Sequence, residues 1–298
     1  MPPTCAFLAT DDLEGFFTYD HLAVPWFESL GWAVEEVPWR AEAEWSRYEI
    51  VVIRSAWDYQ DAPEDFLRVL SEIDAATRLE NGLDLCRWNL EKTYLRDLED
   101  RGVAVVPTLW RAAGAPLEPS LFDRLGTGEI VVKPVVGANA DRTHRIRRDE
   151  LEARRTAAER DLAGRAGMVQ PFLTGIVEEG EYSLFSFDGV FSHAVLKTPT
   201  PGDFRVQEEH GGRIRTVEAE PALLAAGEAA LAALDRPPLY ARADFVRCGG
   251  RFLLMELELI EPSLYFPFDP ESPRRFAEAT VRRVDARSSG RRRRGGAR

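Results

Sequence analysis

The chain has 298 residues, of which 45% are hydrophobic and 30% are charged, and its formal net charge at pH 7 is −12. This composition excludes a disordered chain, and no apolar run approaches the ~20 residues that cross a bilayer. The acidic charge argues against nucleic acid and anionic membranes as partners. Three scattered cysteines without a CxxC pair, and an N-terminus without signal-peptide features, predict a cytoplasmic protein. The length predicts two domains, or one domain of two or three lobes.

The first ninety residues alternate between predicted strands and helices. Residues 5–10 and 49–53 are continuous apolar runs, which are typical of buried parallel strands. Residues 19–30 and 63–73 have the apolar periodicity of helices. Such alternation predicts a parallel sheet that binds ligands where its strands end.

Polar and aromatic side chains follow two of these strands, and we expect them to line a substrate pocket. They are Asp11, after the first strand, and Arg54, Ser55, Trp57 and Asp58 in the segment RSAWDY. A positive and a negative charge together suit a zwitterion such as an amino acid or its derivative. For Trp57 and Tyr59, packing into the core is an equal alternative.

From about residue 89 the pattern changes to shorter, mixed elements. An alternating segment over residues 181–195 predicts an antiparallel hairpin with a two-residue turn at Asp188-Gly189. The last residues are Arg, Gly and Ser, a composition that predicts disorder. Further strands are expected at 103–106, 130–132, 168–172, 240–246 and 252–259. The predicted parts are an N-terminal α/β domain (1–88), a central lobe (89–172), a C-terminal lobe (173–285) and a basic tail (286–298).

Lysine is unusually rare in this chain. Of the 38 basic residues only three are lysines, Lys92, Lys133 and Lys197. Because arginine can replace lysine on a solvated surface, the positions where lysine persists are candidates for sites that need a compact ammonium group. Lys133 ends an apolar strand (EIVVKP) and precedes a loop of small residues, an arrangement suited to gripping phosphate. The GxxxxGK[ST] and GxGxxG motifs are absent.

Three acidic residues near the C-terminus predict a metal site. Asp244 lies within an apolar strand, and Glu256 and Glu258 lie two apart on one face of the next strand. Carboxylates placed this way repel one another unless a cation neutralises them, and their oxygen ligands suit Mg²⁺. The alternative is that Glu256 and Glu258 lie on the solvated face of an edge strand.

Taken together and in this order, these segments resemble the ATP-grasp ligases, in the branch near bacterial glutathione synthetase and D-alanine–D-alanine ligase. The resemblance covers most of residues 1–283 and is sharpest from Arg87 to Phe266. It implies an α/β protein of the ATP-grasp fold, in which an N-terminal parallel-sheet domain precedes two α+β lobes that enclose the nucleotide. It also implies ATP and two Mg²⁺ ions as cofactors, with Mn²⁺ as an alternative metal.

The resemblance assigns roles to individual residues. The nucleotide would be bound by Lys92 in RWNLEKTYL, Lys133, the adenine hinge residues Gln170, Phe172 and Leu173, and the acids Glu178 and Glu181 in the loop and strand that follow. Metal binding would fall to Asp244, Glu256 and Glu258, and oxyanion stabilisation to Arg242. Lys197 and Arg205 would lead into, and lie within, a substrate-covering loop at residues 198–212.

The implied reaction activates a substrate carboxylate as an acyl phosphate, which an amine then attacks. The partners would be a small-molecule carboxylate and an amine, and a homo-oligomer stays open. Within the family, the segments RSAWDY and RWNLEKTYL are similar to the ligase that closes O-ureido-D-serine to D-cycloserine. The alternatives are an intermolecular peptide-forming ligase, an ATP-grasp kinase that phosphorylates a hydroxyl, and a catalytically silent nucleotide-binding module.

Overall fold

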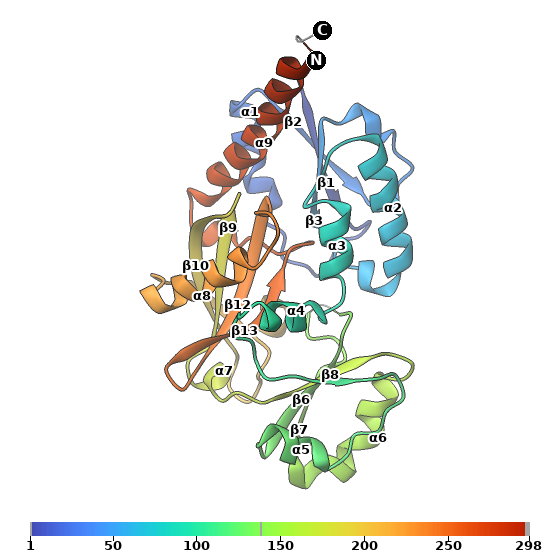
Figure 1. Ribbon diagram of the computed structural model, residues 1–298, viewed down its shortest axis with the longest axis vertical. Coiled ribbons are helices and arrows are strands. Elements are labelled where there is room, and N and C mark those ends of the chain that lie inside the picture. Colours follow the sequence, from blue (N-terminus) through green and yellow to red (C-terminus); the bar gives the residue numbers. More distant parts are fainter. Residues whose placement is uncertain (1, 138, 296–298) are drawn as a thin grey trace.

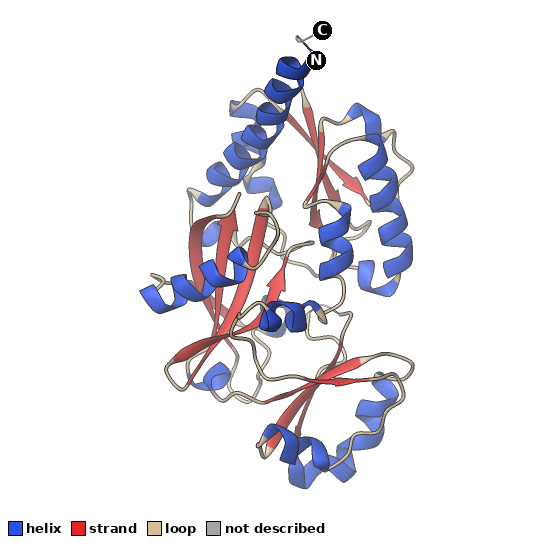
Figure 2. Ribbon diagram, in the orientation of Figure 1, coloured by secondary structure: helices blue, strands red, loops and turns tan. Residues whose placement is uncertain are grey.

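The computed structural model describes residues 2–137 and 139–295, and three separate β-sheets organise this part of the chain (Figure 1). One sheet is parallel and the other two are antiparallel. Helices cover the sheets on their outer sides, as Figure 2 shows. This arrangement confirms the predicted α/β architecture of a parallel-sheet domain with two further lobes.

The N-terminal domain contains the parallel sheet, whose strand order is β2-β1-β3-β4. Its strands are β1 (Thr4–Ala9), β2 (Ala33–Pro38), β3 (Ile50–Ser55) and β4 (Leu79–Glu80). Every residue of β3 is buried because helices pack on both faces of the sheet. One face meets α1 (Val24–Ser29) and α9 (Ser272–Gly295), and the other meets α2 (Pro63–Ala76) and α3 (Leu83–Asn89).

The predicted helix over residues 19–30 is divided into two pieces. A 3₁₀ turn covers Asp20–Leu22, and α1 begins only at Val24. Pro25 lies in the first turn of α1, where a missing backbone N–H is tolerated, and it cannot sit inside a longer helix. The short turn matters for the site below, because it carries Asp20 into the interior.

The central lobe is a small antiparallel sheet with the order β5-β8-β6-β7 and two covering helices. Its elements are β5 (Leu109–Arg111), α5 (Ser120–Leu125), β6 (Glu129–Pro134), β7 (His144–Arg147), α6 (Leu151–Asp161) and β8 (Gly167–Pro171). Phe122, Ile130 and Ile146 form its core. Figure 1 shows this lobe as a separate body at the end of the molecule away from the N-terminal domain.

The C-terminal lobe is a larger antiparallel sheet with the order β11-β10-β9-β12-β13. Its elements are α7 (Gly175–Glu178), β9 (Glu181–Phe187), β10 (Val190–Thr198), β11 (Arg213–Thr216), α8 (Pro221–Ala232), β12 (Tyr240–Cys248) and β13 (Arg251–Glu258). The predicted hairpin is confirmed as β9–β10. Asp188 and Gly189, at its turn, both have positive φ, as a tight two-residue turn requires.

A further segment packs differently from what its sequence predicts. Residues 103–106 form no strand, and only a single parallel bridge joins Val105 to Leu254. The helix α4 (Tyr94–Asp100) packs on the C-terminal sheet, where the backbone N–H of Leu257 donates to the Tyr94 hydroxyl at 2.9 Å. A strand needs a partner along its length, and residues 103–106 meet β13 only around Leu254.

The last helix, α9, extends into the segment that is predicted to be a disordered basic tail. The helix extends to Gly295, well past residue 286 where disorder was expected, and residues 296–298 lie outside the described residues. Arginine has a high intrinsic helix propensity, so a run of arginines can prolong a helix that is anchored earlier. The anchor is the N-terminal half of α9, where Phe276 packs against Phe7 and Phe27. Across residues 2–137 and 139–295, no helix combines the length and apolarity needed to cross a membrane.

Candidate active site

A cavity lies where the N-terminal domain and the two lobes meet. Its empty volume is about 1720 Å³, including the open solvent at its mouth. The central lobe contributes β6, the loop after it and the end of β8, and the C-terminal lobe contributes β9, β10, β12 and β13. Residues 57 and 59 reach it from the N-terminal domain. A cavity lined by charged and aromatic side chains from all three parts of the protein is the candidate site for a ligand.

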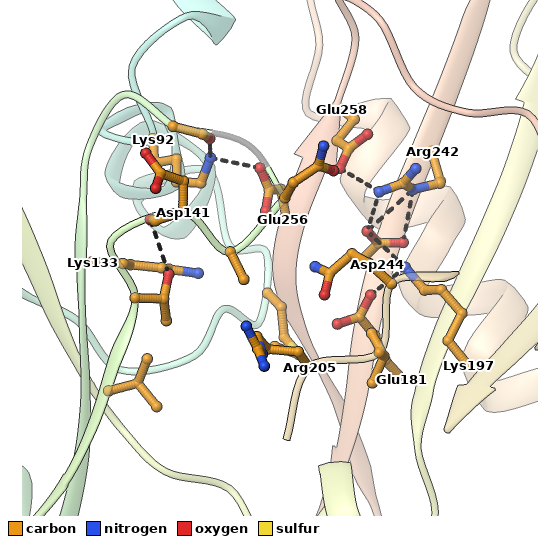
Figure 3. Close-up of a pocket in the computed structure, with 18 of the residues that line it drawn as sticks. Lys92, Lys133, Asp141, Glu181, Lys197, Arg205, Arg242, Asp244, Glu256 and Glu258 are labelled. Carbon is orange, nitrogen blue, oxygen red and sulfur yellow. Dashed lines mark hydrogen bonds and ion pairs between the residues drawn. The ribbon is translucent and has the colours of Figure 1, made fainter. Parts of the chain in front are cut away.

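The carboxylates that were predicted to bind metal share one face of two paired strands. The register places Asp244 opposite Glu256 and Arg242 opposite Glu258. Because side chains alternate along a strand, all four lie on the same face, and all four line the cavity (Figure 3). Although β13 is an edge strand, the alternative of a solvated face for the two glutamates is therefore wrong.

Basic side chains neutralise these acids. The Arg242 guanidinium pairs with Asp244 at 3.0 Å and also with Glu258. Lys197 pairs with Glu181 and lies 3.4 Å from Asp244. Burial opposes ionisation of Asp244, but Arg242 and Lys197 outweigh it and lower the pKa of this carboxyl to about 2. For Glu258 burial wins, only partly offset by Arg242, and raises its pKa to about 8.

The other two lysines approach the cavity from the opposite side. Lys92 pairs with Glu256 at 2.7 Å and donates to the Gly137 carbonyl at 2.6 Å, which ties it to the loop after β6. Lys133 differs, because no carboxylate of the described residues lies within 4 Å of its ammonium group. Burial lowers the pKa of Lys133, and Glu256 only partly offsets this effect. Lys133 is thus a cation that faces the cavity without a counter-ion.

The predicted hinge residues lie together along one wall. Gln170, Phe172 and Leu173 all line the cavity. The Gln170 amide donates to the Thr108 hydroxyl at 2.9 Å, and the Arg145 guanidinium lies 3.7 Å from the centre of the Phe172 ring. Glu181 lies on the adjoining wall at the start of β9. Glu178 is exposed instead, because it ends the short helix α7 and does not line the cavity.

Four of the five residues predicted to contact substrate do not line the cavity. Arg54 is buried and pairs with Asp20 at 2.9 Å, and the Ser55 hydroxyl donates to the same carboxylate. Asp58 accepts from the Trp39 indole at 2.7 Å and pairs with Arg40, a residue 3.7 Å from the exposed Asp11. The charged members of this set therefore have partners within the N-terminal domain. The position of a residue at a strand end does not by itself reveal such a partner.

Trp57 and Tyr59 do line the cavity, and they meet an acid that the sequence analysis missed. The Trp57 indole donates to the Glu261 carbonyl at 2.8 Å. Tyr59 is buried and stacks on Phe66 with 4.9 Å between the rings, so its packing role is also correct. Burial raises the pKa of Glu261 to about 7, partly offset by Lys92 and by hydrogen bonding from Tyr59. A glutamate between Ile260 and Pro262, just beyond an apolar strand, was the available signal.

The loop after β10 bridges all three parts of the protein. Glu208 accepts from the Tyr19 hydroxyl of the N-terminal domain at 3.0 Å, and the His210 ring lies 3.3 Å from the Asn139 carbonyl of the central lobe. Arg205 lines the cavity and pairs with Asp203 at 2.7 Å. The loop therefore covers the cavity, as the sequence predicts.

The donor set suits a hard divalent cation, although it is not arranged as a finished metal site. Within residues 2–137 and 139–295, no three His, Cys, Asp or Glu side chains converge at metal-ligand spacing. The reason is visible in the ion pairs, since Glu256 is directed to Lys92 and Glu258 to Arg242. The carboxylate oxygens nevertheless share one face and one cavity, which fits Mg²⁺.

The fold and the site together define the class. A parallel-sheet domain followed by two lobes, with two lysines on one side of their shared cavity and the carboxylates on the other, is the architecture of an ATP-grasp ligase. The chain superimposes on D-alanine–D-alanine ligase from Bacillus anthracis with a TM-score of 0.69 over 98% of this chain and 99% of that one, at 10% identity. The ATP-grasp ligase PsnB gives a TM-score of 0.64, at 19% identity, over 94% and 99% of the chains.

Closer similarity defines the family. Residues 5–81 match the N-terminal domain of D-cycloserine synthetase DcsG. The chain is 35% identical to the cycloserine biosynthesis protein DcsG of Streptomyces lavendulae, over 86% of this chain and 90% of that protein. The crystal structure of D-cycloserine synthetase DcsG superimposes with a TM-score of 0.84 at 31% identity, covering 94% of this chain and 99% of that one. The chain belongs to the DcsG family of ATP-grasp ligases.

Proposed function

We propose that this protein closes an amino-acid derivative into a ring by ATP-dependent amide formation, with O-ureido-D-serine as substrate and D-cycloserine as product. The observation that carries the proposal is the pairing of a DcsG-type N-terminal domain with the lysines, arginine and carboxylates expected of an ATP-grasp site around one cavity. The family relationship supports the same substrate, because the similarity to DcsG extends over 86% of the chain.

In the proposed reaction, the substrate carboxylate attacks the γ-phosphorus of ATP and ADP leaves. The resulting acyl phosphate is then attacked by the oxygen-bound nitrogen of the ureido group, and phosphate leaves. The carbamoyl group on that nitrogen must then be lost to water, as carbon dioxide and ammonia, to give D-cycloserine. Phosphoryl transfer depends on positioning and charge neutralisation more than on acid–base chemistry. Lys92 and Lys133 would hold the phosphate groups, and Lys133 suits this role because its ammonium group has no counter-ion among the described residues.

The remaining proposed roles follow the cavity wall. Gln170, Phe172 and Leu173 would receive the adenine, and Glu181 the ribose. Arg242 would bind the substrate carboxylate and stabilise the oxyanion that develops from it. Asp244, Glu256 and Glu258 would hold Mg²⁺, which neutralises charge on the phosphates when bound. The loop over the cavity would exclude water, which otherwise hydrolyses an acyl phosphate.

Turnover with O-ureido-D-serine tests the proposal. Purified protein is incubated with ATP, Mg²⁺ and O-ureido-D-serine, and the products are identified by mass spectrometry and by ADP release. We expect ADP and phosphate in equal amounts and a product with the mass of D-cycloserine. ADP release that requires a second, separate amine would instead indicate an intermolecular ligase.

The kinase alternative gives a different product. A kinase would transfer the phosphoryl group to a hydroxyl and leave a stable phosphorylated compound without free phosphate. Hydroxylamine separates these outcomes, because it captures an acyl phosphate as a hydroxamate and does not react with a phosphate ester. Absence of hydroxamate, with a phosphate ester in its place, would overturn the ligase proposal.

A further inference from the structure

Glu261 is unusual among the buried acids of this protein. Five carboxylates are buried within the described part of the chain, namely Asp20, Glu80, Glu181, Asp244 and Glu261. The first four each pair with a lysine or an arginine. Glu261, only 9% exposed, has no cationic partner within 4 Å among the described residues. Since buried charges in proteins are normally paired, this carboxylate lacks the partner that its burial calls for.

The basic side chains around the cavity do not fill this role. Lys92 pairs with Glu256, Lys197 with Glu181, and Arg242 with Asp244 and Glu258. Yet Glu261 lines the same cavity, so a cation that enters the cavity can reach it. The missing partner is therefore expected from outside the protein.

The surroundings of Glu261 place it on the substrate side of the cavity. It lies beyond the end of β13, three residues after Glu258, where the chain crosses to the N-terminal domain. The Trp57 indole fixes its backbone carbonyl at 2.8 Å, and Tyr59 lines the same cavity. Both aromatic residues belong to the segment, residues 5–81, that matches the N-terminal domain of D-cycloserine synthetase DcsG.

We propose that Glu261 is the subsite for the ammonium group of the amino-acid substrate. The inference rests on the proposed function, because it assumes a substrate that carries both a carboxylate and a free amine. Arg242 offers a positive charge for the carboxylate, and Glu261 offers a negative charge for the amine, so the two residues together select a zwitterion. The subsite is separate from the metal-binding acids, which lie on the paired strands β12 and β13.

Equilibrium binding tests this subsite without relying on turnover. Calorimetry compares O-ureido-D-serine with 3-(ureidooxy)propanoate, which lacks only the amino group, in the presence of Mg²⁺ and a non-hydrolysable ATP analogue. The wild-type protein should prefer the amine-bearing ligand by about 10- to 100-fold, the usual range for a hydrogen bond between charged groups. In Glu261→Gln, which keeps the size of the side chain, this preference should disappear. The matched control Glu64→Gln changes an exposed glutamate on α2 and should keep the preference.

The binding measurements distinguish an ammonium subsite at Glu261 from the other roles that this residue could have. An E261Q protein that retains the wild-type preference overturns the subsite, and so does a wild-type protein that binds the two ligands equally, a measurement that requires no variant. A shift of tenfold or more in the Mg²⁺ concentration for half-maximal nucleotide binding in E261Q would make Glu261 a metal ligand and also overturn it. If the wild-type protein selects the amine but forms no D-cycloserine, the subsite stands and the proposed function fails.

Discussion

Replacing Lys133 and replacing Lys92, the two lysines that we propose to bind phosphate, should have different effects on stability but the same effect on turnover. Lys133 has no counter-ion among the described residues, and burial lowers the pKa of its ammonium group. Lys92 pairs with Glu256 at 2.7 Å and donates to the Gly137 carbonyl at 2.6 Å. Methionine keeps the length of either side chain and removes only the charge, so Lys133→Met and Lys92→Met form a matched pair.

The expected magnitudes follow from these contacts. Lys133→Met removes a charge that costs free energy where it is, so the free energy of unfolding should stay the same or rise by up to about 1 kcal/mol. Lys92→Met leaves the partly buried Glu256 and a carbonyl oxygen without their donor, and the free energy of unfolding should fall by about 1–2 kcal/mol. Both variants should lose about 10²- to 10³-fold in kcat, the usual effect of removing one group that stabilises transition-state charge.

Urea denaturation of the protein without nucleotide gives the stabilities, and phosphate release gives the rates. The reasoning would be refuted if Lys133→Met destabilised the protein as much as Lys92→Met does, because Lys133 would then have a structural partner. Turnover within tenfold of wild type in Lys133→Met would remove its phosphate-binding role. The arginine variant of Lys133 restores the charge but not the compact ammonium group, and we expect it to recover only part of the rate.

Three further predictions concern charge elsewhere in the protein. Burial lowers the pKa of His193 to about 4 from a usual value of 6.5, so as the pH falls the unfolded chain binds a proton before the folded protein does. The free energy of unfolding, measured by urea denaturation, should therefore fall by about 3 kcal/mol between pH 6.5 and pH 4. Arg54→Met leaves buried Asp20 unpaired and should lower the free energy of unfolding by about 3–5 kcal/mol. Arg242→Met exposes Asp244 and Glu258 to mutual repulsion, so Mg²⁺ without nucleotide should raise the melting temperature more in this variant than in wild type.

Each of these three has its own control. His193→Gln should flatten the pH dependence between 6.5 and 4, and an unchanged slope would assign it to another group. Combining Arg54→Met with Asp20→Asn should cost less than the sum of the two single changes, and strict additivity would deny the pair. Equal Mg²⁺ stabilisation of Arg242→Met and wild type would show that these acids do not receive the metal.

The parts of the fold that the sequence reveals are those with a regular pattern. The buried strands β1 and β3 are continuous apolar runs, and the hairpin β9–β10 combines alternation with an Asp-Gly turn, so local pattern and tertiary structure agree. The predicted strand at residues 103–106 has the same apolar character but forms only one bridge. Whether such a run becomes a strand depends on a neighbouring backbone, which a local pattern does not contain.

Within the site, the sequence identified several residues that line the cavity, but it did not reveal which side chains pair with one another. The scarcity of lysine identified Lys92, Lys133 and Lys197, and all three line the cavity. Arg54 looked like a substrate ligand because it ends a buried strand, yet Asp20 neutralises it across 34 positions of sequence. Glu261 was missed because the feature that singles it out, a buried carboxylate without a cationic partner among the described residues, cannot be seen in the sequence. Both facts depend on long-range packing, which sequence spacing does not encode.

The pattern of ion pairs also explains how so many acids can share one cavity before a ligand enters. Glu256 and Glu258 are separated by their cations, Lys92 and Arg242, and Lys197 stands between Glu181 and Asp244 (Figure 3). Each pair lowers the repulsion that would otherwise oppose folding, and two of the cations, Lys92 and Arg242, are also ones that the proposed reaction uses. When nucleotide and Mg²⁺ bind together, phosphate can replace the carboxylates as the partner of the cations, and Mg²⁺ can replace the cations as the partner of the carboxylates. The charges are then compensated both in the free protein and in the complex. We therefore expect nucleotide and Mg²⁺ to bind cooperatively, and the metal alone to bind weakly, because without phosphate it competes with Lys92 and Arg242 for the same oxygens.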